Sequence, residues 1–291
     1  MISTKKSTNR ITIFNVLTTV LIQGIAFFTA PLFSRLLGTA NYGVYSVFSM
    51  WVSIVAIVFG LQTFTTIIVA PGEFPDEDQL KYQSSILFLS ITSYLSFSLL
   101  ALVFMKPISV LLKMDPLLCI IMLVQGFATM CISFANAKFT CEFKAESNLI
   151  LSLTSSVVGI IISLILFNLI PLSINYYARI LGVTIGDTLI AIVFCIYIFK
   201  KSRTFYNKEY WRFCLPLSVP YIFHSISGIL LNQSDKVMIQ QILNYSQAGI
   251  YSLACSFAGI MTVIYCALNN SWVPFYFEYL RRNKIDEMHK H

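Results

Sequence analysis

Residues 36–47 of the chain, LLGTANYGVYSV, recur 206 positions later as residues 242–253, ILNYSQAGIYSL. Four aligned pairs are identical, namely Leu37/Leu243, Gly43/Gly249, Tyr45/Tyr251 and Ser46/Ser252. Six apolar spans separate equivalent points of the two copies, and an even number of crossings returns a chain to the same side of a membrane. Both copies therefore enter the membrane in the same orientation, and the sequence predicts a parallel internal duplication.

The chain is far too apolar for a soluble protein. Hydrophobic residues make up 57% of it and charged residues 11%, whereas soluble domains carry about 25% charged residues. Stretches of about 20 apolar residues match the roughly 30 Å hydrocarbon core of a bilayer. They lack the alternation of barrel strands, so their backbone groups must be satisfied within helices. The sequence predicts an all-α integral membrane protein.

Eight apolar stretches are long enough to be transmembrane helices. They cover residues 11–33, 44–69, 85–104, 117–137, 149–169, 179–199, 213–241 and 248–268. The repeat divides the chain into a first six-helix lobe over residues 1–199, a basic cytoplasmic linker over 200–212, and the start of a second lobe over 213–291. This last part holds helices seven and eight and a charged cytoplasmic tail.

The distribution of basic residues predicts the orientation of these helices. With the N-terminus in the cytoplasm, fifteen of the 20 lysines and arginines fall on the cytoplasmic side and five on the outer side. This asymmetry follows the positive-inside rule. Both termini are therefore predicted to be cytoplasmic. Topology accounts for the net charge of +7, and the charge gives no reason to expect a nucleic-acid partner.

Residue types that form catalytic and metal sites are sparse. The 7 cysteines are scattered without paired spacing, so the sequence predicts neither a disulfide framework nor a metal site. The 3 histidines are His224, His289 and His291, and no large loop covers a site. A membrane enzyme would gather acid, base or metal-binding groups at one membrane face. We therefore expect no enzymatic activity, no catalytic residues and no cofactor.

Asp187 is an ionisable group within an apolar span. Such a group costs at least about 2.5–3.5 kcal/mol at the centre of a bilayer, which makes it a candidate for function. Asp187 lies about two turns into the sixth span among apolar neighbours, so we expect it to face the interior of the bundle. Two roles stay open. The carboxyl group either makes a hydrogen bond between helices or binds a proton or cation that couples transport.

The seventh span carries a polar stripe. His224 and Asp235 are eleven residues apart, which is about 20° beyond three full turns, so both lie on one helix face about 16 Å apart. Asn232 flanks this face and Lys236 follows Asp235. The 206-residue shift places Asp235 within a helix rather than in a loop. The stripe favours a cavity between two lobes, and the alternative is an ion pair near the outer membrane surface.

Arg35 lies at the outer end of the first span, and its counterpart in the repeat is the uncharged Gln241. A guanidinium group there can bind phosphate through two hydrogen bonds. The alternative is that its long side chain only reaches the headgroup layer.

Prolines and glycines indicate how two of the helices pack. Pro216 and Pro220 fall in the first turns of the seventh span, where each removes a backbone donor and bends the helix. Gly182 and Gly186 in the sixth span have the spacing that lets a second helix approach closely.

Two stretches carry a resemblance to a known family. They are APLFSRLLGTANYGVYSVF at residues 30–48 and LPLSVPYIFHSISGILLNQSDKVMIQQILNYSQAGIYSLA at residues 215–254. The chain resembles bacterial polysaccharide repeat-unit flippases, the O-antigen type within the multidrug/oligosaccharidyl-lipid/polysaccharide exporter superfamily. The resemblance covers essentially the whole chain, and it identifies the superfamily better than the cargo.

The resemblance implies two six-helix lobes around a central, partly cationic cavity. Alternating access would move polyprenyl-pyrophosphate-linked oligosaccharide, of the O-antigen (lipopolysaccharide) or capsule type, across the bacterial cytoplasmic membrane. Arg35, Asp235 and Lys236 would face this cavity, where the cations would meet pyrophosphate or acidic sugars. His224, Asn232 and Asp187 are further candidates. The implied partners are the lipid-linked oligosaccharide, membrane lipids and other polysaccharide assembly proteins.

Other functions stay open at this point. The predicted spans form one lobe and only the first two helices of a second, which is what a truncated, non-transporting fragment of a flippase would show. A drug or cation antiporter of the same superfamily would share the fold. Loss of glycan or loss of drug resistance in cells that lack the protein distinguishes the two transporters.

Overall fold

The computed structural model describes residues 2–142, 144–171, 174–259, 261 and 265. Within those residues the regular structure is helical and no strand occurs. Six of the described helices are long and apolar enough to cross a membrane. These findings confirm the prediction of an all-α integral membrane protein.

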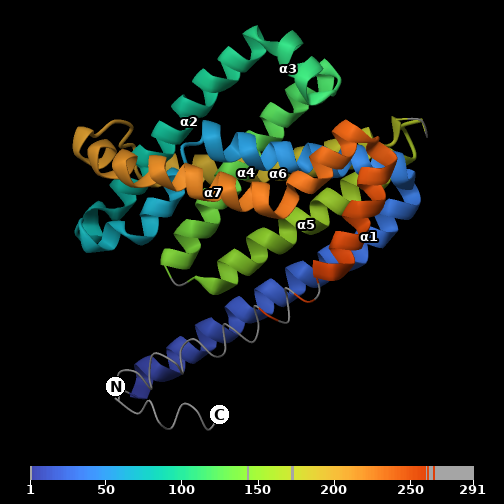
Figure 1. Cartoon of the computed structure of the whole chain (residues 1–291). Helices are drawn as coiled ribbons and strands as arrows, with labels where there is room; N and C mark the ends of the chain where they lie inside the picture. Colours follow the sequence, from blue (N-terminus) through green and yellow to red (C-terminus); the bar gives the residue numbers. More distant parts are fainter. Residues whose placement is uncertain (1, 143, 172–173, 260, 262–264, 266–291) are drawn as a thin grey trace, which may run out of the picture.

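The first two predicted spans lie in one helical element. Helix α1 (Ile2–Phe59) contains a non-helical residue at Gly38, with φ 73° and ψ 165°. Glycine adopts this left-handed conformation readily because it lacks a Cβ atom. Figure 1 shows α1 as two arms, one running from the N-terminus to the bend and the second turning back across the molecule. The bend falls at Gly38 and not at Pro31, which stays helical.

The second predicted span, 44–69, is wrong at its end, because the helix stops at Phe59. Leu61 and Gln62 adopt left-handed φ angles of 55° and 51°, which no α-helix accommodates. The chain then forms three short turns, η1 (Thr63–Ile68), η2 (Ala70–Gly72) and η3 (Asp76–Asp78). Hydropathy did not reveal this break, since η1 still contains apolar residues, namely Phe64, Ile67 and Ile68.

The remaining helices lie within a few residues of their predicted spans. They are α2 (Gln79–Val103), α4 (Pro116–Cys141), α5 (Ala145–Phe167), α6 (Tyr176–Lys201) and α7 (Lys208–Ile242). A short helix that the sequence did not predict, α3 (Met105–Leu112), joins α2 to α4.

Only the start of the eighth predicted span, 248–268, can be compared with the structure. Residues 245–259 are helical. Most of the span beyond them, and the charged tail with His289 and His291, lies outside the described residues. The merging of two spans in α1 and this limit together explain why six spans are observed where eight were predicted.

Small residues bring α5 and α6 together, as the glycine spacing in α6 predicts. A Cβ atom placed on Gly186 would lie 3.2 Å from the backbone nitrogen of Gly159. One placed on Gly182 would lie 2.5 Å from the backbone nitrogen of Ser163. Larger side chains at these positions would force the two helices apart.

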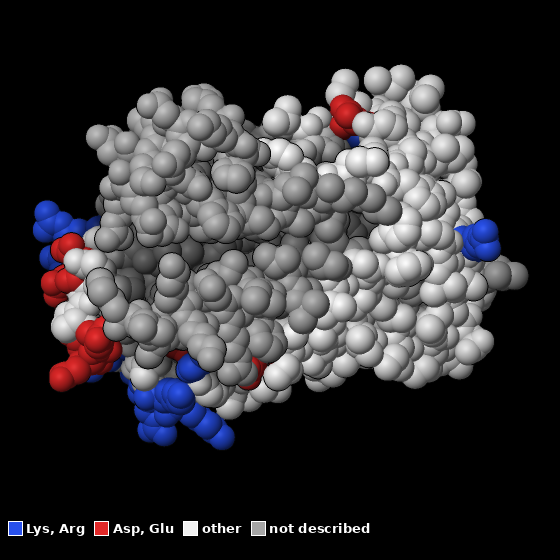
Figure 2. Space-filling view, turned by 90° about the horizontal axis from the view of Figure 1, so that it is seen from below, with Lys and Arg blue, Asp and Glu red and all other residues white. Residues whose placement is uncertain are grey.

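The outer surface of the bundle is apolar along its sides. Large side chains such as Leu99, Val103 and Val193 are 65%, 77% and 68% exposed. On the face drawn in Figure 2, most charged side chains gather at one end, a few lie at the opposite end or along the edges, and most of the described surface between them is uncharged. An apolar band between charged ends is what a bilayer-spanning protein presents to lipid.

Candidate functional site

The two copies of the repeat pack directly against each other. The hydroxyl of Ser46 donates a 2.7 Å hydrogen bond to the hydroxyl of Ser252, its own repeat counterpart. The hydroxyls of Thr39 and Ser246 lie 2.8 Å apart. In Figure 1 the helical segment that follows α7 runs beside the bend of α1. The repeat found in the sequence is therefore a structural contact.

Two glycines lie at the centre of this contact, which we call the repeat crossing (residues 39–46 and 245–252). A Cβ atom on Gly43 would collide with the carbonyl oxygen of Tyr245, and one on Gly249 would collide with the carbonyl oxygen of Thr39. Tyr245 is the repeat counterpart of Thr39. Such reciprocal contacts are what a two-fold axis between equivalent surfaces produces. The repeat crossing thus has pseudo-two-fold symmetry.

The loop after α3 holds the end of α7 at the same end of the bundle. The ammonium group of Lys113 donates to the carbonyl oxygen of Gln241 at 3.1 Å, and the Tyr245 hydroxyl donates to the carbonyl oxygen of Lys113 at 2.7 Å. Burial raises the pKa of Tyr245 to about 12, so this hydroxyl stays protonated and able to donate. We call helices α1 to α6 the first lobe. Together with the repeat crossing, these bonds hold α7 against the first lobe at this end of the junction between them.

Toward the other end, the same junction carries an open cavity of about 780 Å³, which we call the junction hollow. It lies between η1, the second half of α4 and the first half of α7. The lining residues are Gln62, Phe64, Thr65, Thr66, Ile68, Val69, Ser133, Asn136, Ala137, Thr140, Leu217, Tyr221 and Ser225. None of them is charged. Its volume falls in the range of about 300–1,000 Å³ that is typical of small-molecule sites.

One side-chain bond crosses the junction hollow from the first lobe to α7. The amide nitrogen of Gln62 donates to the hydroxyl of Ser225 at 2.6 Å, and Gln62 is only 4% exposed. Its left-handed backbone directs the chain out of α1 and into η1. The proline-containing part of α7, with Pro216 and Pro220, forms the α7 wall around Leu217 and Ser225.

The charged candidates from the sequence lie outside the junction hollow. Arg35 is exposed, three residues before the bend at Gly38. Asp235 is exposed on α7 and accepts a 2.7 Å hydrogen bond from the Tyr251 hydroxyl. Lys236 is half-buried beside it in the sequence. The structure thus places Asp235 and Lys236 within a helix, as predicted, and away from the cavity lining.

The other α7 candidates are exposed in the middle of that helix. The ring of His224 packs 5.2 Å from the ring of Tyr221, which lines the junction hollow. Asn232 donates to the carbonyl oxygen of Gly228 in its own helix at 2.7 Å. The polar stripe therefore exists as one exposed face of α7. Its N-terminal end, at His224, adjoins the hollow through Tyr221.

Asp187 is buried inside the first lobe, at 8% exposure. One carboxylate oxygen accepts a 2.8 Å hydrogen bond from the amide of Gln125 on α4, and the other accepts from the hydroxyl of Ser155 on α5. The hydrogen bond between helices is therefore present. Gln125 also lines a separate cavity of about 180 Å³ with Tyr45, Ser49 and other residues. A role of Asp187 in ion coupling stays a prediction.

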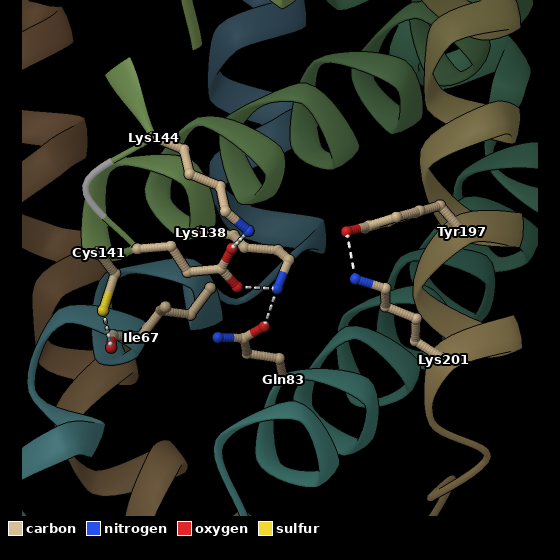
Figure 3. Close-up of polar contacts among 8 residues, drawn as sticks. Ile67, Gln83, Lys138, Cys141, Lys144, Tyr197 and Lys201 are labelled. Carbon is tan, nitrogen blue, oxygen red and sulfur yellow. Dashed lines mark hydrogen bonds and ion pairs between the residues drawn. The ribbon is translucent and has the colours of Figure 1, made fainter. Parts of the chain in front are cut away.

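Sequence reasoning missed a buried lysine at the end of α4 (Figure 3). Lys138 is 1% exposed. Its ammonium group donates to the amide oxygen of Gln83 on α2 at 2.6 Å and pairs with the carboxylate of Glu142. Lys144 pairs with the other oxygen of Glu142 at 2.6 Å. We call these four residues the α4-end cluster, and it ties α2 to the end of α4.

The charges of the α4-end cluster change the acidity of its carboxyl group. Partial burial alone would raise the pKa of Glu142, but hydrogen bonds and charges from Lys138 and Lys144 outweigh it and lower that pKa below its ordinary value. The available sequence signal was the spacing of Lys138 and Glu142, because oppositely charged residues four apart meet on a helix. In the sequence Lys138 counted only as one of the cytoplasmic cations.

The described residues form no candidate metal site. Within the described ranges, no three His, Cys, Asp or Glu side chains lie together in a way that could hold a metal ion. The cavities just described are lined by hydroxyl, amide and apolar groups.

The chain matches a protein family and is similar to known proteins. The family model described as "Polysaccharide biosynthesis protein" matches residues 10–280. Two Haemophilus influenzae proteins are similar to the chain. One, named "Lsg locus putative protein 1", is 25% identical over 175 residues, which are 54% of this chain and 42% of that protein. An "Uncharacterized membrane protein" is 24% identical over 119 residues, which are 38% of this chain and 29% of that protein.

The matched stretches thus span less than half the length of either relative. No solved structure matches the chain. The family model covers both copies of the repeat, the junction hollow and almost every described residue. It also agrees with the resemblance to polysaccharide flippases that the sequence carries. This all-α integral membrane protein belongs to the family of polysaccharide biosynthesis proteins.

Proposed function

We propose that the protein, a membrane transporter of polysaccharide biosynthesis, translocates polyprenyl-pyrophosphate-linked oligosaccharide repeat units of the O-antigen or capsule type. Transport would cross the bacterial cytoplasmic membrane by alternating access. The lipid tail would stay in the bilayer while the oligosaccharide passes between the two repeats.

The observation that carries this proposal is the pairing of the repeats. Residues 39–46 and 245–252 contact each other reciprocally, with hydroxyl bonds between Thr39 and Ser246 and between Ser46 and Ser252. Transporters built from parallel repeats use the junction between the repeats as the substrate pathway. The junction hollow lies along the same boundary, between the first lobe and α7.

We assign the charged part of the cargo to the outer half of this pathway. Arg35 offers a guanidinium group that matches phosphate geometry, and it is exposed near the repeat crossing. Lys236 offers a second cation, and Asp235 is held by Tyr251. His224 and Asn232 would line the exposed face of α7 between these charges and the junction hollow.

For energy coupling we propose Asp187. A buried carboxyl group inside a membrane protein is a candidate for proton or cation binding. It has two neutral hydrogen-bond donors, and the cavity beside Gln125 gives small ions or water a place next to it. The substitution Asp187→Asn keeps the size of the side chain and removes its charge, so it should abolish the dependence of export on the ion gradient while the protein still inserts.

The test is made in a strain that lacks the gene, with the full-length gene product restored. Polyprenyl-linked repeat units trapped inside the cell and glycan at the surface are both quantified. The wild-type gene should clear the trapped units and restore surface glycan. The variants Arg35→Ala and Asp235→Ala should reduce export about tenfold or more while the protein remains in the membrane.

Normal surface glycan in the deletion strain would contradict the proposal. Loss of drug resistance in place of glycan would identify an antiporter instead. Full export by both alanine variants would remove Arg35 and Asp235 from the pathway. As a matched control, Lys81→Ala changes an exposed lysine that pairs with Asp78 at 2.8 Å and lies outside the junction, and it should leave export unchanged.

A further inference from the structure

The polar groups of the junction hollow are hydroxyls and amides, and none of them is charged. The hydroxyl groups of Ser133, Thr140 and Tyr221 line it and make no hydrogen bond to any residue that the structure describes. The amide oxygens of Gln62 and Asn136 are shielded from solvent and also have no hydrogen-bond partner there. Buried polar atoms are almost always hydrogen-bonded in folded proteins, and these two oxygens would gain a partner in the hollow only if their amide groups rotated toward it.

The groups that line the hollow suit an uncharged ligand that both donates and accepts hydrogen bonds. An amide side chain such as that of Gln62 or Asn136 has an oxygen that accepts and a nitrogen that donates. The three free hydroxyls can both donate and accept. A carboxylate or phosphate would find no cation among the lining residues, and a charge that loses water without gaining an opposite charge is disfavoured.

From this geometry we infer that the junction hollow is a subsite for uncharged sugar residues, which discriminates against acidic sugars. Gln62 and Asn136 would bind sugar hydroxyls through their amide groups. Each amide oxygen reaches the cavity only when its amide group rotates, and for Gln62 this rotation breaks the bond to Ser225. Phe64 and Tyr221 supply the apolar and aromatic lining that small-molecule sites need. The inference rests on the proposed function, and it replaces the expected cationic cavity with a neutral one in this part of the pathway.

The bond between Gln62 and Ser225 gives the subsite a way to respond to its ligand. It links the first lobe to α7 across the cavity at 2.6 Å. A sugar hydroxyl that binds the Gln62 amide or the Ser225 hydroxyl in place of this bond competes with it. Binding therefore weakens the link between α7 and the first lobe at the point where the two repeats would separate.

The test compares two probes on the purified full-length protein in lipid nanodiscs. One is a short-chain polyprenyl pyrophosphate that carries a neutral hexose, and the other carries the matching hexuronic acid. Repeat units extracted from the deletion strain serve as the reference ligand. The neutral probe should bind about tenfold more tightly than the acidic probe, because both share the same lipid and pyrophosphate.

Two variants and a control test whether the difference in affinity between the probes arises in the junction hollow. Asn136→Ala removes the amide group that lines the hollow and should weaken binding of the neutral probe about threefold to tenfold, as expected for one lost neutral hydrogen bond. Asn148→Ala is the matched control, because Asn148 also has a buried unpaired amide oxygen but does not line the hollow. Asn148→Ala should leave the affinity for the neutral probe unchanged. Gln62→Leu adds a second test, with the thermal stability of each variant recorded beside its affinity.

Equal binding of the two probes, or equal effects of Asn136→Ala and Asn148→Ala, would overturn the neutral subsite and leave the proposed function standing if the extracted repeat units still bind. Failure of all three ligands to bind the folded wild-type protein would overturn the proposed function together with the subsite.

Discussion

At the scale of single residues, Gly43 and Gly249 have no space for a methyl group, because each lies against a carbonyl oxygen of the other repeat. We predict that Gly43→Ala lowers the free energy of unfolding by about 1–3 kcal/mol, the usual cost of overpacking. Thermal unfolding of the purified protein in detergent measures this. Gly228→Ala is the control, since nothing lies within 4 Å of a Cβ atom there. Equal unfolding temperatures for both variants would contradict the repeat crossing.

The α4-end cluster makes a prediction about pH. The pKa of Glu142 lies below its ordinary value of 4.5 in the folded protein, because Lys138 and Lys144 outweigh the effect of partial burial. A carboxyl group whose pKa falls on folding stabilises the fold above its unfolded value, and this stabilisation is lost as the pH falls through the folded value. The Glu142→Gln variant should therefore be less stable than the wild type at pH 7.

At pH 7 the free energy of unfolding of Glu142→Gln should be about 1–3 kcal/mol lower than that of the wild type. This is less than the cost of breaking a fully buried ion pair, since Glu142 is partly exposed. The difference from the wild type should shrink as the pH is lowered below 4.5. Unfolding curves of both proteins at several pH values test this. A difference that stays constant down to acid pH would show that the ion pairs of Glu142 do not stabilise the protein.

At the scale of helices, the apolar stretches of the sequence located α2 and α4 to α7, because each is a long run bounded by charged or polar residues. The early end of α1 could not be predicted, since η1 is apolar and the break depends on the backbone of Leu61 and Gln62. The polar stripe of α7 was predictable from helix periodicity. The junction hollow was not, because its uncharged lining comes from three separate segments.

The contact between the second arm of α1 and residues 245–259 gives a cross-linking prediction. The hydroxyl oxygens of Ser46 and Ser252 lie 2.7 Å apart, so cysteines there should reach the 2.03–2.05 Å of a disulfide with small side-chain movements. In a cysteine-free background, Ser46→Cys with Ser252→Cys should cross-link on oxidation. A protease site placed in the non-helical residues 202–207 then lets a gel show whether the two halves stay joined.

The control pair for this experiment is Ser96→Cys with Ser252→Cys, because Ser96 is exposed on α2 and hydrogen-bonds only within its own helix, to Thr92. In that variant the two halves of the chain should separate on the gel after cleavage. Separation of the Ser46–Ser252 pair as well would mean that the repeats do not pack as described.

At the scale of the whole molecule, the charge distribution predicts which end of the bundle faces the cytoplasm. Ala40 is exposed beside the bend of α1, and Lys201 is exposed at the end of α6. In spheroplasts of cells with a cysteine-free protein, a membrane-impermeant maleimide should label Ala40→Cys at once and Lys201→Cys only after permeabilisation. The reverse pattern would overturn the topology, and with it the direction of transport.

The central claim is that the protein itself moves lipid-linked oligosaccharide between leaflets, and reconstitution tests it most directly. Repeat units extracted from the deletion strain are placed in vesicles with the purified full-length protein, and an impermeant glycosidase is added outside. We predict that the glycosidase reaches nearly all of the lipid-linked oligosaccharide in vesicles with the protein, and only the outer-leaflet pool in vesicles without protein. In vesicles with the Arg35→Ala variant it should reach the inner-leaflet pool more slowly. Digestion limited to the outer-leaflet pool in every case would contradict the claim.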